Sequence, residues 1–149
     1  MIDLPFGRVG ILADADGVSG IGLVSRKTAI ADADNAVARQ ACVELRKYAR
    51  DPSFRFTLPL NVQGTAFQKQ VWRALVSITP GRPETYGSLA RKLKTSARAV
   101  GGACRENPVP VIVPCHRVVA ANGNGGFMGQ RSGLATAMKA WLLNHEAGD

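Results

Sequence analysis

An apolar run that ends at a proline and a cysteine constrains this chain more than any other feature. Residues 109–119 read V-P-V-I-V-P-C-H-R-V-V. The short apolar run predicts a buried strand, and Pro114, which has no amide hydrogen to donate, marks its expected end. Cys115 and His116 follow at once, so the strand should place a thiol and an imidazole at the mouth of a core. A thiol beside a possible base is a candidate nucleophile, although a packing cysteine would look the same in sequence.

Length and charge predict one or two small lobes and a polyanionic partner. At 149 residues the chain can form one domain or two lobes, and Gln63-Gly64 suggests a linker between residues 1–62 and residues 63–149. The net charge of +8 is uneven, because the first 60 residues carry 8 basic and 7 acidic side chains and the remainder carry 11 and 4. A basic C-terminal half predicts nucleic-acid binding, but a solvated basic surface would have the same composition.

The cysteine and histidine content argues against disulfides and against zinc. Three cysteines make no disulfide framework, and with the absence of a signal peptide they predict a reducing cytoplasm. His116 and His145 are the two histidines, and no Cys/His spacing resembles a zinc site, so we expect no metal. No apolar run approaches the ~20 residues that span a bilayer, so we expect no membrane partner.

The N-terminal sequence predicts a small sheet with one helix. Residues 8–13 and 19–24 flank a turn and predict a hairpin. Residues 34–49 predict a helix, because apolar residues recur at helical spacing while Glu44 falls among the wetter positions. Residues 54–60 predict a further strand. No residue of this lobe suggests chemistry.

Caps and apolar stripes predict two helices of the C-terminal lobe. Thr65 and Gln68 form a capping-box pattern ahead of a helix over residues 66–77, in which we interpret Trp72 as a core residue. The last helix is predicted over residues 134–144. Its predicted core stripe comprises Leu134, Met138, Trp141 and Leu142.

Between them the chain predicts a helix–turn–helix. Its helices are expected over residues 85–93 and 96–105, with Ser96 as the N-cap of the second. The second helix has a small-residue face that should be buried, formed by Ala97, Val100, Gly101 and Cys104. Another face carries two cations around a glycine, which would permit close approach to a phosphate backbone; these residues are Arg98, Gly102 and Arg105. Helix packing would explain the small residues equally well.

A glycine-rich segment over residues 122–133 follows the cysteine. Glycine at this density permits turns with positive φ and exposes backbone amides. The segment can be read as a flexible connector or as the wall of a pocket beside Cys115. A phosphate-binding loop is not expected, because no βαβ unit surrounds it.

Several ordered motifs together resemble one family. P-C-H-R-V, preceded by R-A-V-G-G-A and N-P-V-P and followed by the glycine loop and K-x-W-L-L-x-x-E, is similar to the O6-alkylguanine-DNA alkyltransferases over about residues 64–146. The resemblance implies that Cys115 accepts the alkyl group. It also implies that His116 and Glu146 form a relay that withdraws the thiol proton through a water, which spacing alone does not show.

The resemblance assigns DNA contacts and a hinge to the region before the cysteine. Tyr86 is implied to act during nucleotide rotation and to donate to guanine N3, and Arg98 to enter the duplex through the minor groove and fill the vacated space. Asn107 is implied to be the hinge between the recognition helix and the active-site strand. The full set of DNA-binding residues expected is Tyr86, Gly87, Arg98, Gly102, Arg105 and Asn107.

The resemblance also implies a substrate pocket, and there the sequence departs from the family. The expected pocket residues are Pro110, Gly126, Phe127 and Met128. Where the family commonly has a tyrosine after glycine or asparagine, this chain has Phe127. Stacking on the alkyl group remains possible, but a hydroxyl contact is lost, which affects how bulky adducts would be accepted.

These observations predict an α+β protein. A small N-terminal sheet-plus-helix lobe of RNase H-like type should pack on a mainly helical C-terminal lobe with a helix–turn–helix and a short active-site strand. The expected function is single-turnover, stoichiometric transfer of methyl or larger alkyl groups from O6-alkylguanine, and less well from O4-alkylthymine, in double-stranded DNA to Cys115. The protein is expected to be a monomer without a cofactor, since its nucleophile is consumed. The alternatives are a non-catalytic helix–turn–helix DNA-binding protein and a sensor of alkylated DNA.

Overall fold

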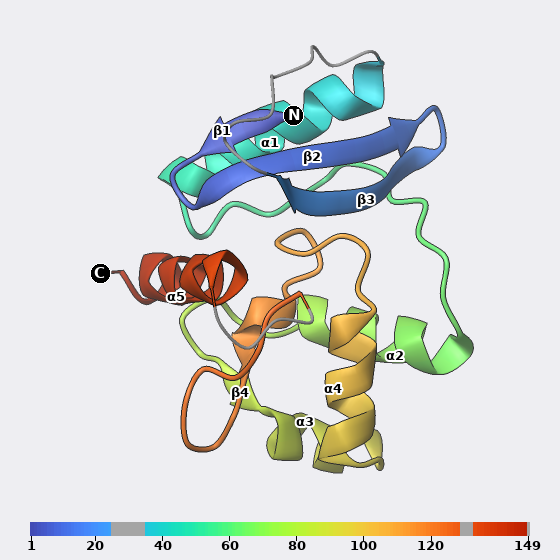
Figure 1. Ribbon diagram of the computed structural model, residues 1–149. Helices are drawn as coiled ribbons and strands as arrows, with labels where there is room; N and C mark the ends of the chain where they lie inside the picture. The colour runs from blue at the N-terminus through green and yellow to red at the C-terminus, as the bar shows by residue number, and fades with distance from the viewer. Residues whose placement is uncertain (25–34, 129–132, 149) are drawn as a thin grey trace. The chain divides into compact units, whose positions relative to one another are not determined.

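The computed structural model describes residues 1–24, 35–128 and 133–148, and the chain divides into two compact units, Met1–Gln63 and Gly64–Asp149 (Figure 1). Within these described residues, the first unit holds a small antiparallel sheet with one α-helix, and the second holds four α-helices and a two-stranded parallel sheet. The predicted α+β class is confirmed. No described helix combines the length and apolar character needed to cross a bilayer.

In the first unit, the sheet has the order β1 (Ile2–Leu4), β2 (Gly7–Asp14) and β3 (Gly17–Val24), all antiparallel. The predicted hairpin is therefore confirmed. Its turn requires glycine at Gly17, where φ is +143° and a Cβ would lie 2.8 Å from the carbonyl oxygen of Pro59.

Helix α1 (Ala36–Arg50) lies across one face of this sheet (Figure 1). It begins after Asn35, whose side-chain oxygen accepts from the amide of Ala38 at 2.8 Å and whose side-chain nitrogen donates to the carbonyl of Ala13 in β2 at 2.9 Å. This N-cap residue therefore ties the helix to the sheet. The helix buries Ala38, Ala41, Leu45 and Tyr48, as its spacing predicts.

Two expectations for this unit are wrong, and they share a cause. Residues 54–60 form no strand, and Glu44, expected to be solvated, is 4% exposed. The Glu44 carboxylate accepts from the amide and the hydroxyl of Thr57 at 2.7 and 3.0 Å, so this backbone donor is used outside any sheet. Pro59 has no amide to offer. Burial would raise the pKa of Glu44, but these bonds and one from Gln40 outweigh it and lower that pKa.

The second unit begins with α2 (Ala66–Val76), and its capping box is present. Thr65 Oγ1 accepts from the amide of Gln68 at 3.1 Å, and Gln68 Oε1 accepts from the amide of Thr65 at 2.9 Å. Trp72 is buried, and its Nε1 donates to the carbonyl of Ala103 at 2.9 Å. Its interpretation as a core residue is confirmed.

The helix–turn–helix is also confirmed, with α3 (Tyr86–Leu93) and α4 (Ala97–Arg105) packed together (Figure 1). Helix α3 ends at Lys94 in the left-handed conformation, and Ser96 Oγ caps α4 by accepting from the amide of Ala99 at 3.1 Å. The buried face differs from the expected one, because Ala97 at the first turn is exposed. The buried residues of α4 are Val100, Ala103 and Cys104.

The apolar run before the cysteine is not a strand, which corrects the prediction for residues 109–113. It forms a tight turn closed by the amide of Val113 on the carbonyl of Val109 at 3.0 Å, with φ of +75° at Val111. The prolines at 108 and 110 offer no ladder donors, which explains why an apolar composition did not produce a strand. The short strand at this site comes after the cysteine.

That strand is β5 (Val118–Val119), which pairs in parallel with β4 (Glu84–Thr85) just before α3. The 3₁₀ turn η1 (Cys115–Arg117) precedes it and contacts both α2 and α5 (Leu134–Ala147). Helix α5 is longer than predicted. Its core stripe also differs, because Leu134 is 74% exposed whereas Lys139 is fully buried.

Candidate active site

The site is built around Cys115, the first residue of η1. The turn is fixed by the amide of Cys115 donating to the carbonyl of Val113 at 2.8 Å and that of Arg117 donating to Pro114 at 3.0 Å. Helices α2 and α5 contact this turn, and Cys115 is 5% exposed. The thiol is thus held by backbone bonds in a largely apolar environment.

Asn107 joins the end of α4 to the turn that carries the cysteine. Its side-chain nitrogen donates to the carbonyl of Val113 at 2.8 Å, and its side-chain oxygen accepts from the amide of Val109 at 3.0 Å. Its own amide donates to the carbonyl of Cys104 at 3.2 Å, and its side chain also hydrogen-bonds the Cys115 thiol. Asn107 is buried, and without its side-chain oxygen the buried amide of Val109 would lack a partner.

His116 and Glu146, 30 residues apart, meet in the core. His116 Nε2 lies 2.8 Å from Glu146 Oε2, and both side chains are buried. Because an ionised carboxylate only accepts hydrogen bonds, Nε2 carries the proton and Nδ1 keeps its lone pair. Nδ1 is buried and has no hydrogen-bond partner among the residues that the structure describes. The arrangement therefore provides an oriented imidazole with a free basic nitrogen.

Two further charged residues at this site were missed by sequence reasoning. Arg117 Nε and Nη2 donate to Glu146 Oε1 and Oε2 at 2.9 and 3.0 Å, and Nη1 donates to the carbonyl of Ile78 at 3.0 Å. Lys139, which we did not single out, is seven residues before Glu146 on α5 and shares its side of the helix. That spacing was the signal by which it could have been found.

Lys139 is fully buried, and burial lowers the pKa of its amine, against the opposing effect of Cys115 and Cys104. Its Nζ donates to the carbonyls of Val118 at 2.7 Å and Gly126 at 3.0 Å, and it lies 5.7 Å from the centre of the Tyr86 ring. No carboxylate pairs with it within the described ranges. A buried cation without a counterion is costly, so carbonyl dipoles and nearby groups that become negative must offset that cost.

The two groups between which the proton is expected to move, the Cys115 thiol and the His116 imidazole, are both neutral at rest. Burial raises the pKa of the Cys115 thiol, although the hydrogen bond from Asn107 and the charge of Lys139 oppose this. Burial lowers the pKa of His116, in opposition to Glu146, so the imidazole is neutral. The resting pair is therefore a thiol beside a neutral base, and a thiolate forms only by proton transfer.

Tyr86 and Cys104 extend the same cluster. Burial, together with the two nearby thiols Cys104 and Cys115, raises the pKa of Tyr86 to about 12. Burial and Cys115 raise the pKa of Cys104 to about 12. Both side chains therefore keep their protons, and Tyr86 can act as a hydrogen-bond donor.

The expected pocket residues lie in two segments around this cluster. Pro110 is buried in the turn held by Asn107, and Phe127 is 3% exposed. The loop passes close to Tyr86, because a Cβ at Gly125, where φ is +77°, would lie 3.2 Å from its ring. The carbonyl of Gly126 binds Lys139, and Met128 is half-buried with φ of +53°. The rest of the glycine segment, residues 129–132, lies outside the described residues.

Apart from Asn107, which lies after α4, the expected DNA-contacting residues lie on the helix–turn–helix. Arg98 and Arg105 are exposed on α4, and a Cβ at Gly102 would meet no atom within 4 Å. Gly87 is in the first turn of α3, next to Tyr86. The structure therefore places two cations and an open backbone position on one helix.

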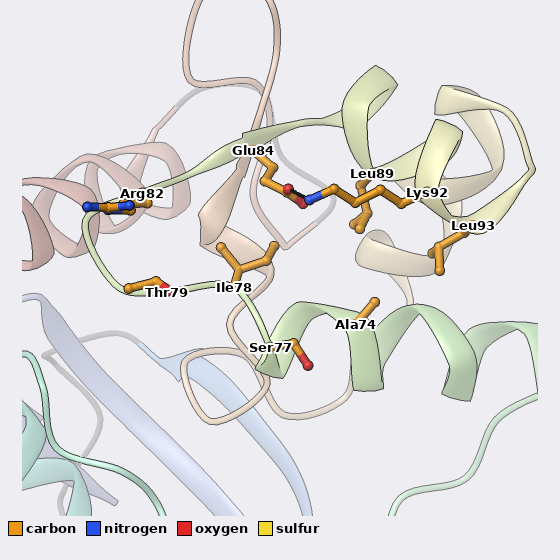
Figure 2. A pocket seen from close by; sticks show the side chains of 9 residues that line it. All are labelled: Ala74, Ser77, Ile78, Thr79, Arg82, Glu84, Leu89, Lys92 and Leu93. Atoms are coloured by element: carbon orange, nitrogen blue, oxygen red, sulfur yellow. Dashed lines mark hydrogen bonds and ion pairs between the residues drawn. The ribbon is translucent and has the colours of Figure 1, made fainter.

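A separate hollow of about 490 Å³ is lined by the end of α2, by α3 and by the segment between these helices, and Figure 2 shows its lining side chains. An ion pair between Lys92 and Glu84 crosses it. It contains none of the residues expected at the thiol or on the DNA. Among the described residues, no group of three or more His, Cys, Asp or Glu side chains could hold a metal ion.

Comparison with known proteins shows the family to which this chain belongs. Residues 66–148 match the family model described as 6-O-methylguanine DNA methyltransferase, DNA binding domain. A methylated-DNA–protein-cysteine methyltransferase of Methanosarcina acetivorans is 35% identical over 98% of this chain and 96% of its own length. The Mus musculus protein of that name is 35% identical over 98% of this chain and 79% of its own length.

Solved structures agree as well. The Mycobacterium tuberculosis O6-methylguanine methyltransferase has a TM-score of 0.82 at 30% identity, covering 99% of this chain and 90% of that chain. Mycobacterium tuberculosis OGT in complex with DNA has a TM-score of 0.77 at 29% identity, covering 99% and 91%. A buried cysteine beside an oriented imidazole, on a fold shared over nearly its whole length, assigns this chain to the methylated-DNA–protein-cysteine methyltransferase family.

Proposed function

We propose that this protein repairs alkylated DNA by moving the alkyl group from O6-alkylguanine, and less well from O4-alkylthymine, to Cys115. The observation that supports this most strongly is the buried His116–Glu146 pair next to Cys115, with Nδ1 of His116 left free to accept a proton. Family membership supplies the substrate class.

The chemistry follows from the protonation states. Nδ1 of His116 takes the thiol proton, directly or through one water, while Glu146 holds the ring and stabilises the imidazolium. The Cys115 sulfur then attacks the alkyl carbon in line, so the carbon–oxygen bond breaks as the carbon–sulfur bond forms. The leaving guanine takes up a proton, and a hydrogen bond from Tyr86 to its N3 stabilises it. A thioether is not hydrolysed under cellular conditions, so each molecule acts once and needs no cofactor.

Binding to double-stranded DNA is proposed for the helix–turn–helix. Arg98 and Arg105 on α4 can neutralise phosphates, and the open position at Gly102 permits close backbone approach. The target base must leave the helix to reach a buried thiol, which costs a few kcal/mol of unstacking. We assign Arg98 to the space that the extruded base leaves in the duplex, which the side chain enters from the minor groove. Tyr86 and Gly87 are assigned to contact with the adjacent phosphate, and Asn107 to the hinge between the recognition helix and the segment that carries the cysteine.

The base and its alkyl group would lie against the pocket formed by Pro110 and the segment of Gly126, Phe127 and Met128. Phe127 offers an aromatic surface without a hydroxyl, which favours apolar adducts. We expect the protein to act as a monomer, in the cytoplasm, with the N-terminal unit as an RNase H-like lobe.

The flipping role of Arg98 predicts a difference between two substrates. Arg98→Ala should slow repair of O6-methylguanine in duplex DNA by about tenfold or more, because the lost side chain no longer offsets unstacking. Reaction with free O6-methylguanine base should change little. Single-turnover rates on both substrates measure this, with the exposed Arg73→Ala on α2 as a matched control. Equal losses on both substrates would contradict the assignment.

The buried ammonium of Lys139 predicts an effect on the thiol. Lys139→Met preserves much of the side-chain volume but removes a charge that lowers the pKa of Cys115, so that pKa should rise. A rise of one unit corresponds to about tenfold less thiolate at neutral pH, and alkyl transfer should slow accordingly. Rates of thiol alkylation and of repair against pH measure the change, with Lys69→Met on the exposed side of α2 as the control. An unchanged pH profile would show that Lys139 only anchors the loop.

A further inference from the structure

The Arg117 side chain makes three hydrogen bonds next to the His116–Glu146 pair. Nε and Nη2 donate to the two carboxylate oxygens of Glu146 at 2.9 and 3.0 Å, and Nη1 donates to the carbonyl of Ile78 at 3.0 Å. Ile78 belongs to the segment between α2 and β4 that Figure 2 draws. A planar guanidinium is suited to this, since its donors are fixed in a fork that matches a carboxylate.

Glu146 is held through its backbone as well as through its side chain. The same segment brings Gly81 against the end of α5, where a Cβ on Gly81 would lie 2.7 Å from the carbonyl oxygen of Glu146. Glu146 thus has little freedom to move, and both oxygens already carry hydrogen bonds. Its orientation toward Nε2 of His116 is fixed by the two hydrogen bonds from Arg117, one of which shares Oε2 with the imidazole.

A carboxylate in this position faces two opposing requirements. It must be ionised to orient and stabilise the imidazole, yet a buried anion beside a neutral imidazole is strongly disfavoured unless a cation compensates it. Without compensation, the pair reduces its energy by taking up a proton, and the proton can settle on Nδ1 of His116. In that state the imidazole has no lone pair left for the thiol proton.

We propose that Arg117 is a positioning residue for alkyl transfer: it holds Glu146 ionised and aligned while keeping His116 neutral, so that Nδ1 can accept the proton of Cys115. This inference rests on the proposed function and adds a residue that does not touch the substrate. Arg117 compensates the carboxylate through two hydrogen bonds.

Burial and the nearby cations act on His116 in the same direction, and Glu146 opposes them. Lys139 on α5 and Arg117 both lower the pKa of His116, adding to the larger effect of burial, while Glu146 raises it. Cys115, next to it in the chain, is a neutral thiol with a raised pKa. Tyr86 on α3 is protonated, and α2 presents the apolar Val71, Trp72 and Leu75 as its buried residues. Arg117 is therefore the cation that contacts the carboxylate directly.

The expected signature is a shift of the acid limb of the pH profile. Removing the cation favours the protonated form of the His116–Glu146 pair, so its apparent pKa rises and the base is lost at a higher pH. In Arg117→Met, a one-unit rise should move the acid limb of the single-turnover rate on O6-methylguanine duplex, at saturating protein, up by about one pH unit; the rate should fall about tenfold at pH values below both pKa values and recover toward alkaline pH. Arg117→Lys, which keeps the charge but loses the fork, should lie between this variant and the wild type.

The matched control is Arg73→Met, which removes an exposed arginine of α2 and should leave the profile unchanged. A purely structural role predicts an equal loss at every pH and no rescue by lysine, and either result would overturn the proposal. The proposal would also be overturned if the rate of Arg117→Met fell at the same acidic pH as the rate of the wild type.

If Arg117→Met does not fold, the protonation state of His116 can still be measured directly in Arg117→Lys and in the wild type. Nitrogen NMR of His116 in the whole protein should show a neutral ring protonated at Nε2 near pH 7 in the wild type, with the onset of imidazolium at higher pH in Arg117→Lys. A wild-type imidazolium at neutral pH would refute the inference. If wild-type protein transfers no methyl group at any pH, the proposed function fails, which is a different outcome from transfer with an unshifted profile.

Discussion

Cys115→Ala is expected to abolish alkyl transfer and to leave binding to alkylated duplex DNA essentially unchanged. The proposed reaction consumes this sulfur, so no residual turnover should replace it. Cys104 is buried in the same unit, but its pKa is raised to about 12, so it holds its proton at neutral pH and does not substitute as nucleophile. Binding should survive, because the cations proposed to contact phosphates lie on α4 and not at the thiol.

The measurement is a pair of assays on one preparation: loss of O6-methylguanine from the duplex, and fluorescence anisotropy of the same oligonucleotide. Cys42→Ala in the N-terminal unit is the matched control and should retain full transfer. Transfer that survives in Cys115→Ala would contradict the assignment of the acceptor. Loss of binding as well as transfer would mean that the cysteine also maintains the structure on which DNA binding depends.

Asn107→Ala is expected to have the second largest effect, on both stability and rate. It leaves the buried amide of Val109 without a partner, which costs about 1–3 kcal/mol, and it removes one of the two donors to the carbonyl of Val113, the other being the amide of Cys115. The free energy of unfolding should fall by about 2–4 kcal/mol. Transfer should slow about 100-fold, since displacement of a reacting group by about 1 Å has effects of that size.

Asn107→Asp separates geometry from charge. It keeps the acceptor for Val109 but loses the donor to Val113, and a carboxylate beside Cys115 would raise the pKa of the thiol further. Its transfer rate should therefore recover at alkaline pH more than that of the alanine variant. Urea unfolding and single-turnover assays measure the two effects, with the exposed Asn144→Ala as control. Wild-type stability in Asn107→Ala would show that these bonds contribute nothing.

The parts of the fold that local chemistry determines could be predicted from sequence. The capping box of Thr65 and Gln68 and the N-cap Ser96 act within one helical turn, and both helices begin where these residues indicate. The strand predicted before Cys115 rested on apolar composition alone, and the alternating prolines of this segment prevented a strand from forming. A tight turn closed by Asn107 requires contacts that no local pattern encodes.

Buried charges were the other class that sequence could not place. Glu44 and Lys139 sit on helices where a charged residue ordinarily predicts the solvated face, and each is buried because partners from distant segments satisfy it. Arg117 was visible in the motif, but its pairing depends on α5 lying against η1. The meeting of His116 with Glu146 was implied by resemblance alone, and only the structure gives its distance.

Peptide mass mapping after incubation with O6-methylguanine duplex tests the central claim most directly. The account predicts that guanine is restored in the DNA and that the peptide containing Cys115 gains about 14 Da, the mass of one methylene, in a one-to-one ratio with the lesions removed. The contradicting result is an unmodified Cys115 that still titrates as a free thiol, or a methyl group on another residue.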